Sequence, residues 1–158
     1  MKTHILTHKD ICAQKDISLF VEIIYNNFID LKVDDKLLHN KNEIEKNLRS
    51  PNTVIIIITN GSGEIIGFLT SNIMVLDDRR KVIYISYIYV AKSERNKKLG
   101  SLLLREAENY GKKMNCIGVM LIFDTYQPKL VNFYEVRGYM LDINLRRYER
   151  HDVYYKTL

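Results

Sequence analysis

One segment, residues 81–123, constrains the fold of this chain more than any other. It begins with the β-branched and aromatic run KVIYISYIYVA at residues 81–91, which predicts a strand. A charged loop follows, then a helical apolar periodicity over residues 100–115 and a second apolar strand at residues 117–123. Strand, loop, helix and strand in this order form a βαβ unit, whose strands pair in parallel within a buried sheet. We therefore expect an α/β protein.

The other patterns add helices and antiparallel strands to this unit. Apolar residues from Ile17 to Leu31 recur at spacings of three and four, which predicts a helix with Asp16 as its N-cap. The further elements expected are helices at residues 37–48 and 128–136 and strands at residues 53–59, 64–76, 139–144 and 152–158, with a short strand suggested at Ile5 and Leu6. The expected fold is a mixed, mostly antiparallel sheet with one parallel unit. Since no linker or repeat interrupts the pattern, residues 1–158 are expected to form a single domain.

Composition excludes several classes of protein. With 46% hydrophobic and 27% charged residues, the chain is globular rather than disordered. The longest apolar run, at residues 54–58, is too short for a bilayer, and the N-terminus has no secretory apolar region, so a cytoplasmic protein without a membrane partner is expected. Cys12 and Cys116 lie far apart and lack metal-ligand spacing, so we expect buried thiols and no metal.

The positive charge is concentrated in one segment. The net charge is +5, and residues 92–113 hold seven basic and three acidic residues. Such a surplus suits nucleic acid, an anionic membrane or a phosphorylated ligand. The aromatic residues fall on expected strands and are not interleaved with the basic loop, which argues against nucleic acid.

The loop at residues 91–100 joins a strand to the start of a helix. Backbone N–H groups in such a loop, the positive end of the helix dipole and Gly100 together can hold a phosphate. The alternative is a solvated turn before a surface helix.

Two motifs resemble those of the Gcn5-related N-acetyltransferases, the GNAT superfamily. Residues 95–100, RNKKLG, are similar to the signature Arg/Gln-x-x-Gly-x-Gly/Ala, and residues 133–139, FYEVRGY, look like Phe-Tyr-x-x-x-Gly-Phe/Tyr further along the chain. The resemblance covers residues 50–158 well. It implies a GNAT-like fold and acetyl-CoA as the cofactor, held by the parallel βαβ unit.

The resemblance also implies roles for residues near the loop. The backbone of the signature segment would bind the coenzyme A pyrophosphate, and main-chain groups of Ile88 and Val90, with their side chains in the core, would contact the thioester and the pantetheine arm. The signature residues are Arg95, Asn96, Lys97, Lys98, Leu99, Gly100 and Ser101. Lys98 replaces the first signature glycine, so a positive φ is not expected there. Its side chain either points to water or lies over a phosphate.

Catalysis would need an acid and a base. Tyr134 matches the family tyrosine that protonates the departing thiolate, although a purely structural buried tyrosine would have the same sequence. The strand glutamate of many relatives is absent, since Tyr84, Ser86 and Tyr87 stand in that region. Asp124, at the end of the following strand, is the candidate base, or it caps the next loop.

The sequence constrains the identity of the acceptor amine less than it constrains the cofactor. The run GKKMNC at residues 111–116 most resembles glucosamine-6-phosphate N-acetyltransferases, whose phosphorylated substrate needs a second anion site. Candidate residues for the acceptor are Tyr84, Ser86, Tyr87, Arg146 and Arg147, and the arginines are alternatively surface charges. A protein lysine, N-terminal or polyamine acetyltransferase and a non-catalytic acyl-CoA-binding module remain alternatives. The late strands would allow a homodimer.

Overall fold

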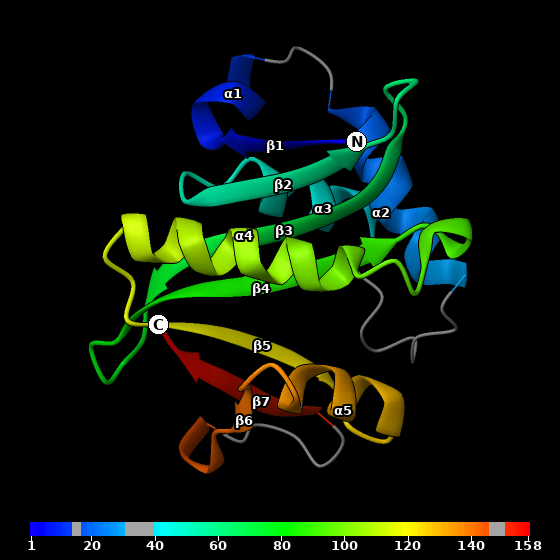
Figure 1. Cartoon of the computed structure of the whole chain (residues 1–158). Helices are drawn as coiled ribbons and strands as arrows, with labels where there is room; N and C mark the ends of the chain where they lie inside the picture. Colours follow the sequence, from blue (N-terminus) through cyan, green and yellow to red (C-terminus); the bar gives the residue numbers. More distant parts are fainter. Residues whose placement is uncertain (14–16, 31–39, 146–150) are drawn as a thin grey trace. The chain divides into compact units, whose positions relative to one another are not determined.

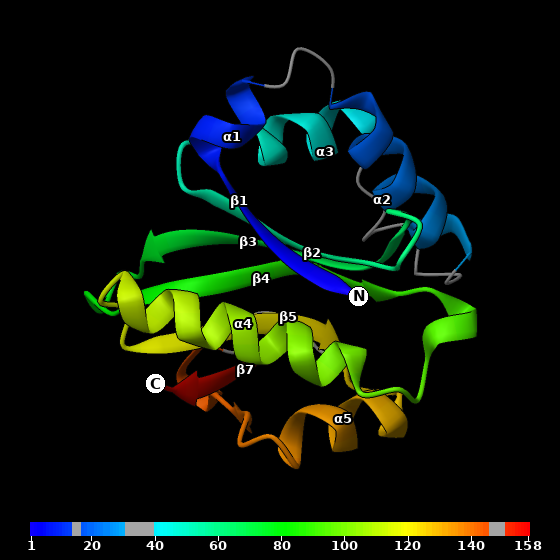
Figure 2. The same cartoon turned by 45° about the horizontal axis from the view of Figure 1, so that its top comes forward.

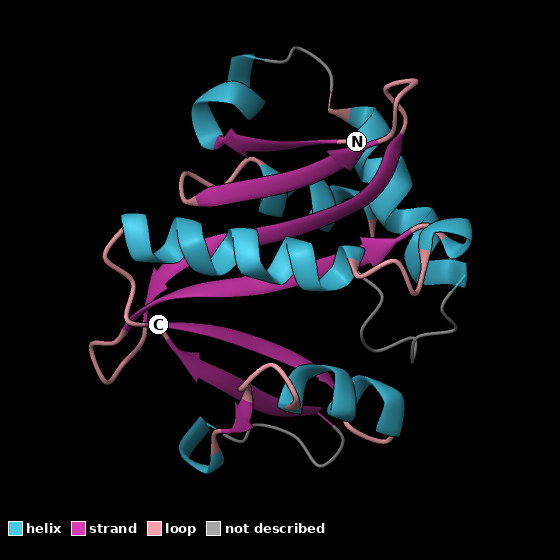
Figure 3. Ribbon diagram, in the orientation of Figure 1, coloured by secondary structure: helices cyan, strands magenta, loops and turns pink. Residues whose placement is uncertain are grey.

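A computed structural model describes residues 1–13, 17–30, 40–145 and 151–158 of the chain (Figure 1). The expected N-cap Asp16 and the acceptor candidates Arg146 and Arg147 lie outside the described residues. The helices and strands, drawn in Figure 3, are β1 (Lys2–Thr7), α1 (His8–Ala13), α2 (Ser18–Asp30), α3 (Lys41–Leu48), β2 (Thr53–Thr59), β3 (Ile65–Val75), β4 (Lys81–Val90), η2 (Lys92–Glu94), α4 (Leu99–Lys113), β5 (Gly118–Asp124), α5 (Pro128–Glu135), β6 (Met140–Leu141), η3 (Ile143–Leu145) and β7 (His151–Thr157).

The strands form a seven-stranded mixed sheet in the order β1-β2-β3-β4-β5-β7-β6. Strands β4 and β5 pair in parallel, with Val82–Ile85 opposite Gly118–Leu121. The pairs β1 with β2, β5 with β7 and β6 with β7 are antiparallel. The expected α/β class, with one parallel unit in a mostly antiparallel sheet, is therefore confirmed.

The chain divides into two compact units. The first comprises Met1–Thr70 with Tyr87–Leu103, and the second comprises Ser71–Ser86 with Leu104–Leu158. Strands β3 and β4 and helix α4 contribute residues to both units. The single domain expected from the sequence stays a prediction.

The first unit packs helices on one face of its strands. Ile55 and Ile57 of β2 point into a core with Ile24 of α2 and Ile44 and Leu48 of α3. Figure 2 shows these helices over β1 and β2. Helix α3 starts at a capping box, in which Asn40 accepts from the Glu43 N–H and Glu43 accepts from the Asn40 N–H.

Gly67 of β3 gives α4 its close approach to the sheet in this first unit. A Cβ at Gly67 would lie 3.2 Å from the Tyr89 carbonyl oxygen and 3.5 Å from Cδ1 of Leu103. The start of α4 therefore packs directly onto β3, beside the strand β4 that ends in the candidate site loop.

The second unit has distinct packing on the two sides of β7. Val153 is buried with Leu76, Val82 and Met120, and Tyr155 packs against them. The neighbouring Tyr154 donates a hydrogen bond to Glu135 of α5 at 3.3 Å. Side chains alternate along a strand, so Val153 and Tyr155 pack on one face of β7 and Tyr154 contacts helix α5 from the other.

The expected strand at residues 139–144 is wrong for most of its length. Only Met140 and Leu141 are β-paired, and η3 follows. Asp142 ends the strand because its carboxylate accepts from both terminal nitrogens of Arg80 at 3.0 Å and from the Asn144 N–H at 3.1 Å. These side-chain contacts favour a turn over further strand pairing.

The N-terminus also differs from expectation. Strand β1 covers Lys2–Thr7 rather than two residues, and α1 follows directly. Ile11 faces the core, so the next residue on the short helix, Cys12, is exposed, and the expectation that both thiols are buried is wrong for Cys12. Cys116 is buried as expected.

Replacement of Gly118 by alanine should destabilise the second unit. A Cβ there would lie 2.1 Å from Cζ and Oη of Tyr155, whose hydroxyl donates to the Ile117 carbonyl and whose ring lies under the Arg80 guanidinium. We expect Gly118→Ala to cost about 2 kcal/mol in denaturant unfolding. Gly61→Ala is the control, because nothing lies within 4 Å of its added Cβ. Equal stability of the two variants would contradict the packing of Tyr155.

Candidate active site

The loop after β4 carries the residues expected to hold an anion. Arg95 is extended, with φ −67° and ψ 159°, and its side-chain Nε donates to the Val90 carbonyl at 3.1 Å. Asn96 and Lys98 have positive φ values of 64° and 62°, whereas Lys97 between them has a negative φ. The expectation that Lys98 has no positive φ is therefore wrong.

The path of the chain from β4 to α4 explains the positive φ of Lys98. A left-handed residue reverses the chain locally, and glycine is the usual residue because any Cβ costs roughly 1 kcal/mol there. Asn96 is a residue type that tolerates this conformation, and Lys98 adopts it although it is not glycine. Leu99, buried as the first residue of α4, anchors the end of the loop.

Alternating signs of φ turn successive backbone N–H groups toward one side, which makes a concave anion site. Helix α4 adds to it, because the first N–H groups of a helix have no acceptor within the helix. The Leu102 N–H bonds to the Lys98 carbonyl at 3.0 Å, so the helical ladder begins after Gly100 and Ser101. The first unit thus holds all seven signature residues in one continuous segment, formed by the loop after β4 and the first residues of α4.

Side chains around this loop are mostly in solvent. Lys97 pairs with Glu94 at 3.1 Å, and both Lys97 and Lys98 are exposed. The exposed side chain of Lys98 is compatible with both expectations. It points to water here, and it could also reach a phosphate bound at the loop. The backbone, rather than a fixed side chain, therefore defines the loop.

Strand β4 carries the other expected contacts in both units. Ile88 and Val90 lie beyond the parallel register, and their side chains are half-buried rather than fully in the core. Tyr87 is only 6% exposed and belongs to the core of the first unit. Tyr84 packs against the strand cluster of the second unit, and Ser86 is half-buried.

Tyr134 lies in α5 of the second unit among aromatic rings. Its ring centroid is 4.7 Å from Phe123, 5.0 Å from Phe133 and 5.8 Å from Tyr139. Burial raises the pKa of Tyr134 to about 12, and the nearby Arg137 charge opposes this only in part. The phenol therefore keeps its proton at neutral pH, as an acid must.

Asp124 closes the turn between β5 and α5. Its carboxylate Oδ1 accepts the Tyr126 N–H at 3.0 Å, and its carbonyl accepts the Gln127 N–H at 3.3 Å. The capping role that the sequence left open is thus present. Its role as a base stays a prediction.

A second group in this unit was not predicted from the sequence. Tyr139 donates to Oε1 of Glu108 in α4 at 3.0 Å, and Lys156 of β7 lies 2.9 Å from both carboxylate oxygens of Glu108. The one sequence signal was the tyrosine of the second motif, because a buried phenol needs a partner. Its partners come from elements 31 and 17 residues away and show no spacing pattern.

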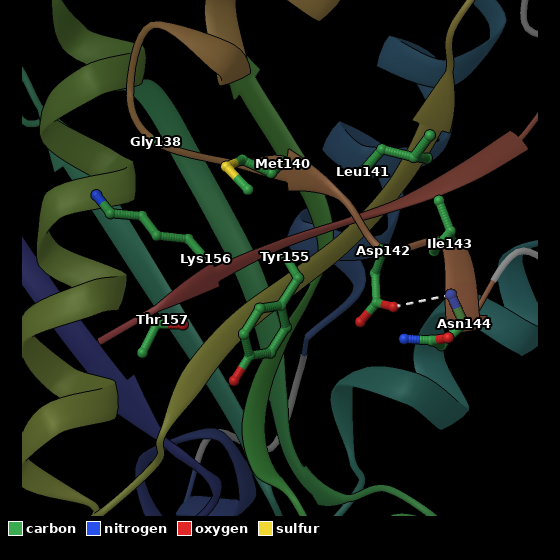
Figure 4. A pocket seen from close by; sticks show the side chains of 9 residues that line it. All are labelled: Gly138, Met140, Leu141, Asp142, Ile143, Asn144, Tyr155, Lys156 and Thr157. Atoms are coloured by element: carbon green, nitrogen blue, oxygen red, sulfur yellow. Dashed lines mark hydrogen bonds between the residues drawn. The ribbon is translucent and has the colours of Figure 1, made fainter.

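A hollow of about 400 Å³ lies in the second unit, around β6, η3 and β7, and Lys156 of the preceding group is among its lining residues (Figure 4). Its lining residues are Gly138, Met140, Leu141, Asp142, Ile143, Asn144, Tyr155, Lys156 and Thr157. None of the site residues expected from the sequence lies among them.

The described residues were compared with the requirements of a metal site and of a membrane-spanning helix. Within residues 1–13, 17–30, 40–145 and 151–158, the side chains of His, Cys, Asp and Glu form no group of three that could hold a metal ion. Over the same part of the chain, every helix is too short or too polar to cross a bilayer.

Comparison with known families agrees with the fold. Residues 21–139 match the family model described as the acetyltransferase (GNAT) family. Because this match covers most of the sequence, the chain belongs to the GNAT acetyltransferase family. The expected class, an N-acetyltransferase enzyme that uses acetyl-CoA, is confirmed at the level of the family.

Individual relatives are more distant. Over 85 residues the chain is 36% identical to glucosamine 6-phosphate N-acetyltransferase from Candida albicans, a match that covers 52% of this chain and 55% of that protein. The chain therefore spans about half the length of this curated relative.

Solved structures extend the likeness over the whole chain. PaiA N-acetyltransferase from Thermoplasma acidophilum in complex with coenzyme A has a TM-score of 0.68 and 16% identity, over 100% of both chains. NAA60 from Arabidopsis thaliana, in complex with a bisubstrate analogue, has a TM-score of 0.70 and 14% identity, over 99% of this chain and 97% of that chain. At this identity the likeness concerns the fold alone.

Proposed function

We propose that this protein transfers the acetyl group of acetyl-CoA directly to a primary amine. The observation that carries the proposal is the loop at residues 95–98, whose alternating φ values and position before α4 suit a pyrophosphate. Bound acetyl-CoA supplies an activated thioester. Arg95 to Ser101 would hold its pyrophosphate through backbone N–H groups, and Ile88 and Val90 would offer main-chain groups to its pantetheine arm.

The catalytic residues stay predictions. Tyr134 would hold a proton on its hydroxyl for the departing thiolate. The support for this role is the match of Tyr134 to the second motif, because the raised pKa of the buried phenol makes it a weaker acid than a free tyrosine. Asp124 would take the proton of the attacking ammonium, directly or through water. Its Oδ1 already accepts the Tyr126 N–H, so a base role would leave that hydrogen bond in place or exchange it.

Glucosamine 6-phosphate is the proposed acceptor. The name of the Candida albicans relative supports it, because 36% identity is the highest among the proteins compared above. Arg146, Arg147, Tyr84, Ser86 and Tyr87 stay candidates for acceptor contacts, with Tyr87 weakened by its place in the core. The first alternative is acetyl transfer to a peptide N-terminus, a protein lysine or a polyamine. The second alternative is a non-catalytic acyl-CoA-binding module.

The remaining expectations concern assembly and location. A homodimer through the late strands is supported by the position of β6 at the edge of the sheet and by Met140 and Ile143, which are 71% and 74% exposed. A cytoplasmic location stays a prediction.

Two variants at Lys98 distinguish the contribution of its side-chain charge to acetyl-CoA binding from that of its backbone conformation. Lys98→Glu should weaken acetyl-CoA binding about tenfold or more, because a carboxylate beside a phosphate repels it. Lys98→Gly should keep most of the affinity, since the positive φ of 62° suits glycine. Affinity is measured by calorimetry and by thermal stabilisation. Lys46→Glu on α3 is the control, because it makes the same charge change at an exposed position remote in sequence. Unchanged affinity of Lys98→Glu would remove this side chain from the site.

Tyr134→Phe tests the chemical step. The variant should bind acetyl-CoA as the parent does, because it retains the buried ring, and its kcat should fall about a hundredfold, within the usual range for loss of an acid. Free thiol release is followed with glucosamine 6-phosphate, a polyamine and a peptide as acceptors. Full activity of Tyr134→Phe would refute the acid role. If the parent binds acetyl-CoA tightly but turns over none of these amines, the acyl-CoA-binding module is favoured.

A further inference from the structure

We propose that Tyr139, Glu108 and Lys156 form a positioning cluster that holds the hydroxyl of Tyr134 in its catalytic orientation. The inference rests on the proposed acid role of Tyr134. It assigns a function to three residues that do not themselves contact the reacting atoms.

Tyr139 is held at both ends within the second unit. Its backbone N–H donates to the Tyr134 carbonyl at 3.2 Å, just after the end of α5. Its hydroxyl donates to Oε1 of Glu108 at 3.0 Å, and its ring is fully buried. The ring therefore spans from the C-terminal end of α5 to α4 with little freedom to move.

Glu108 and Lys156 fix the far end of that span. The ammonium of Lys156 lies 2.9 Å from both oxygens of Glu108 and 5.5 Å from the centroid of the Tyr139 ring. The side chains of Glu108 and Lys156 are 15% and 26% exposed, so water screens their attraction only in part. Burial and the Glu108 carboxylate also raise the pKa of Tyr139, so its hydroxyl remains a donor.

The ring of Tyr139 transmits this restraint to Tyr134. The two rings meet edge to face, with centroids 5.8 Å apart and planes at 71°. Phe123 and Phe133 contact other parts of the Tyr134 ring. Gly138, with φ +83°, makes the turn that brings Tyr139 back to this position. Because proton transfer depends steeply on distance, a displaced Tyr139 should cost turnover rather than cofactor binding.

A double-mutant cycle tests whether the cluster acts through Tyr134. Tyr139→Phe removes only the hydroxyl bonded to Glu108, and we expect kcat to fall about tenfold while acetyl-CoA affinity and KM change less than about twofold. In the Tyr134→Phe background the same substitution should change kcat no further. The control is Tyr155→Phe, which also removes a tyrosine hydroxyl bonded at 3.3 Å to a backbone carbonyl in the second unit. An equal loss of kcat in both backgrounds, or no loss in either, would overturn the proposal.

Rescue distinguishes positioning from simple stability. Glu108→Gln keeps an oxygen that can accept from Tyr139, whereas Glu108→Ala keeps none. We expect the Ala variant to lose at least about threefold more kcat than the Gln variant at a temperature where both are fully folded. Equal kcat values for the two variants would contradict the role of the Tyr139 hydrogen bond.

A readout without turnover keeps this inference separate from the proposed function. In protein labelled at tyrosine and saturated with coenzyme A, the ring-flip rate of Tyr134 is measured by NMR. Tyr139→Phe should speed the flips about tenfold, because rigid packing limits them, and Tyr155→Phe should leave them unchanged. A flip turns the ring about the axis that carries its hydroxyl, so the flip rate reports how tightly the ring is packed. If Tyr134 flips at the parental rate in Tyr139→Phe, that packing restraint is absent and the positioning role is wrong, even if acetyl transfer is established. If the flips accelerate but Tyr134→Phe retains full kcat, the acid role fails and the positioning inference fails with it.

Discussion

The parallel pairing of β4 with β5 is the constraint on which the other features depend. Two parallel strands cannot be joined by a tight turn, so the chain must leave β4, cross the sheet and return to the start of β5. The crossover element is α4, which runs from Leu99 to Lys113. The end of β4 is thereby followed by a loop and a helix N-terminus, the two features that make a backbone anion site.

The loop shows how backbone geometry can persist when a motif residue changes. The family signature has glycine where this chain has Lys98, and Lys98 still adopts a φ of 62°. The cost of a Cβ in this conformation is roughly 1 kcal/mol, small beside the burial of Leu99 and the packing of Leu103 on Gly67 that fix the start of α4. The proposed anion site depends on N–H groups, which lysine provides as glycine does.

Local patterns predicted much of the fold. The β-branched run at Thr53–Thr59 and the β-branched and aromatic run of β4 predicted strands correctly, because these side chains prefer a pleated, buried surface. The strand at residues 139–144 failed because Arg80, a residue 62 positions away, binds Asp142 and ends the pairing. No local pattern contains such a contact. The position of the loop between β4 and α4 was predictable from spacing, and its role as an anion site stays a prediction. The cluster of Glu108, Lys156 and Tyr139 was not predictable, since its members meet only after α4 and β7 have packed.

The central claim is that backbone N–H groups of the loop hold the coenzyme A pyrophosphate. The most direct measurement is the NMR titration of backbone amides with acetyl-CoA, compared with acetyl-pantetheine, which lacks the pyrophosphate. The claim predicts large downfield proton shifts at Asn96, Lys98 and Gly100 with acetyl-CoA, and much smaller shifts at these residues with acetyl-pantetheine. Equal shifts with both compounds, or saturation with acetyl-CoA that leaves these three amides unmoved, would contradict it.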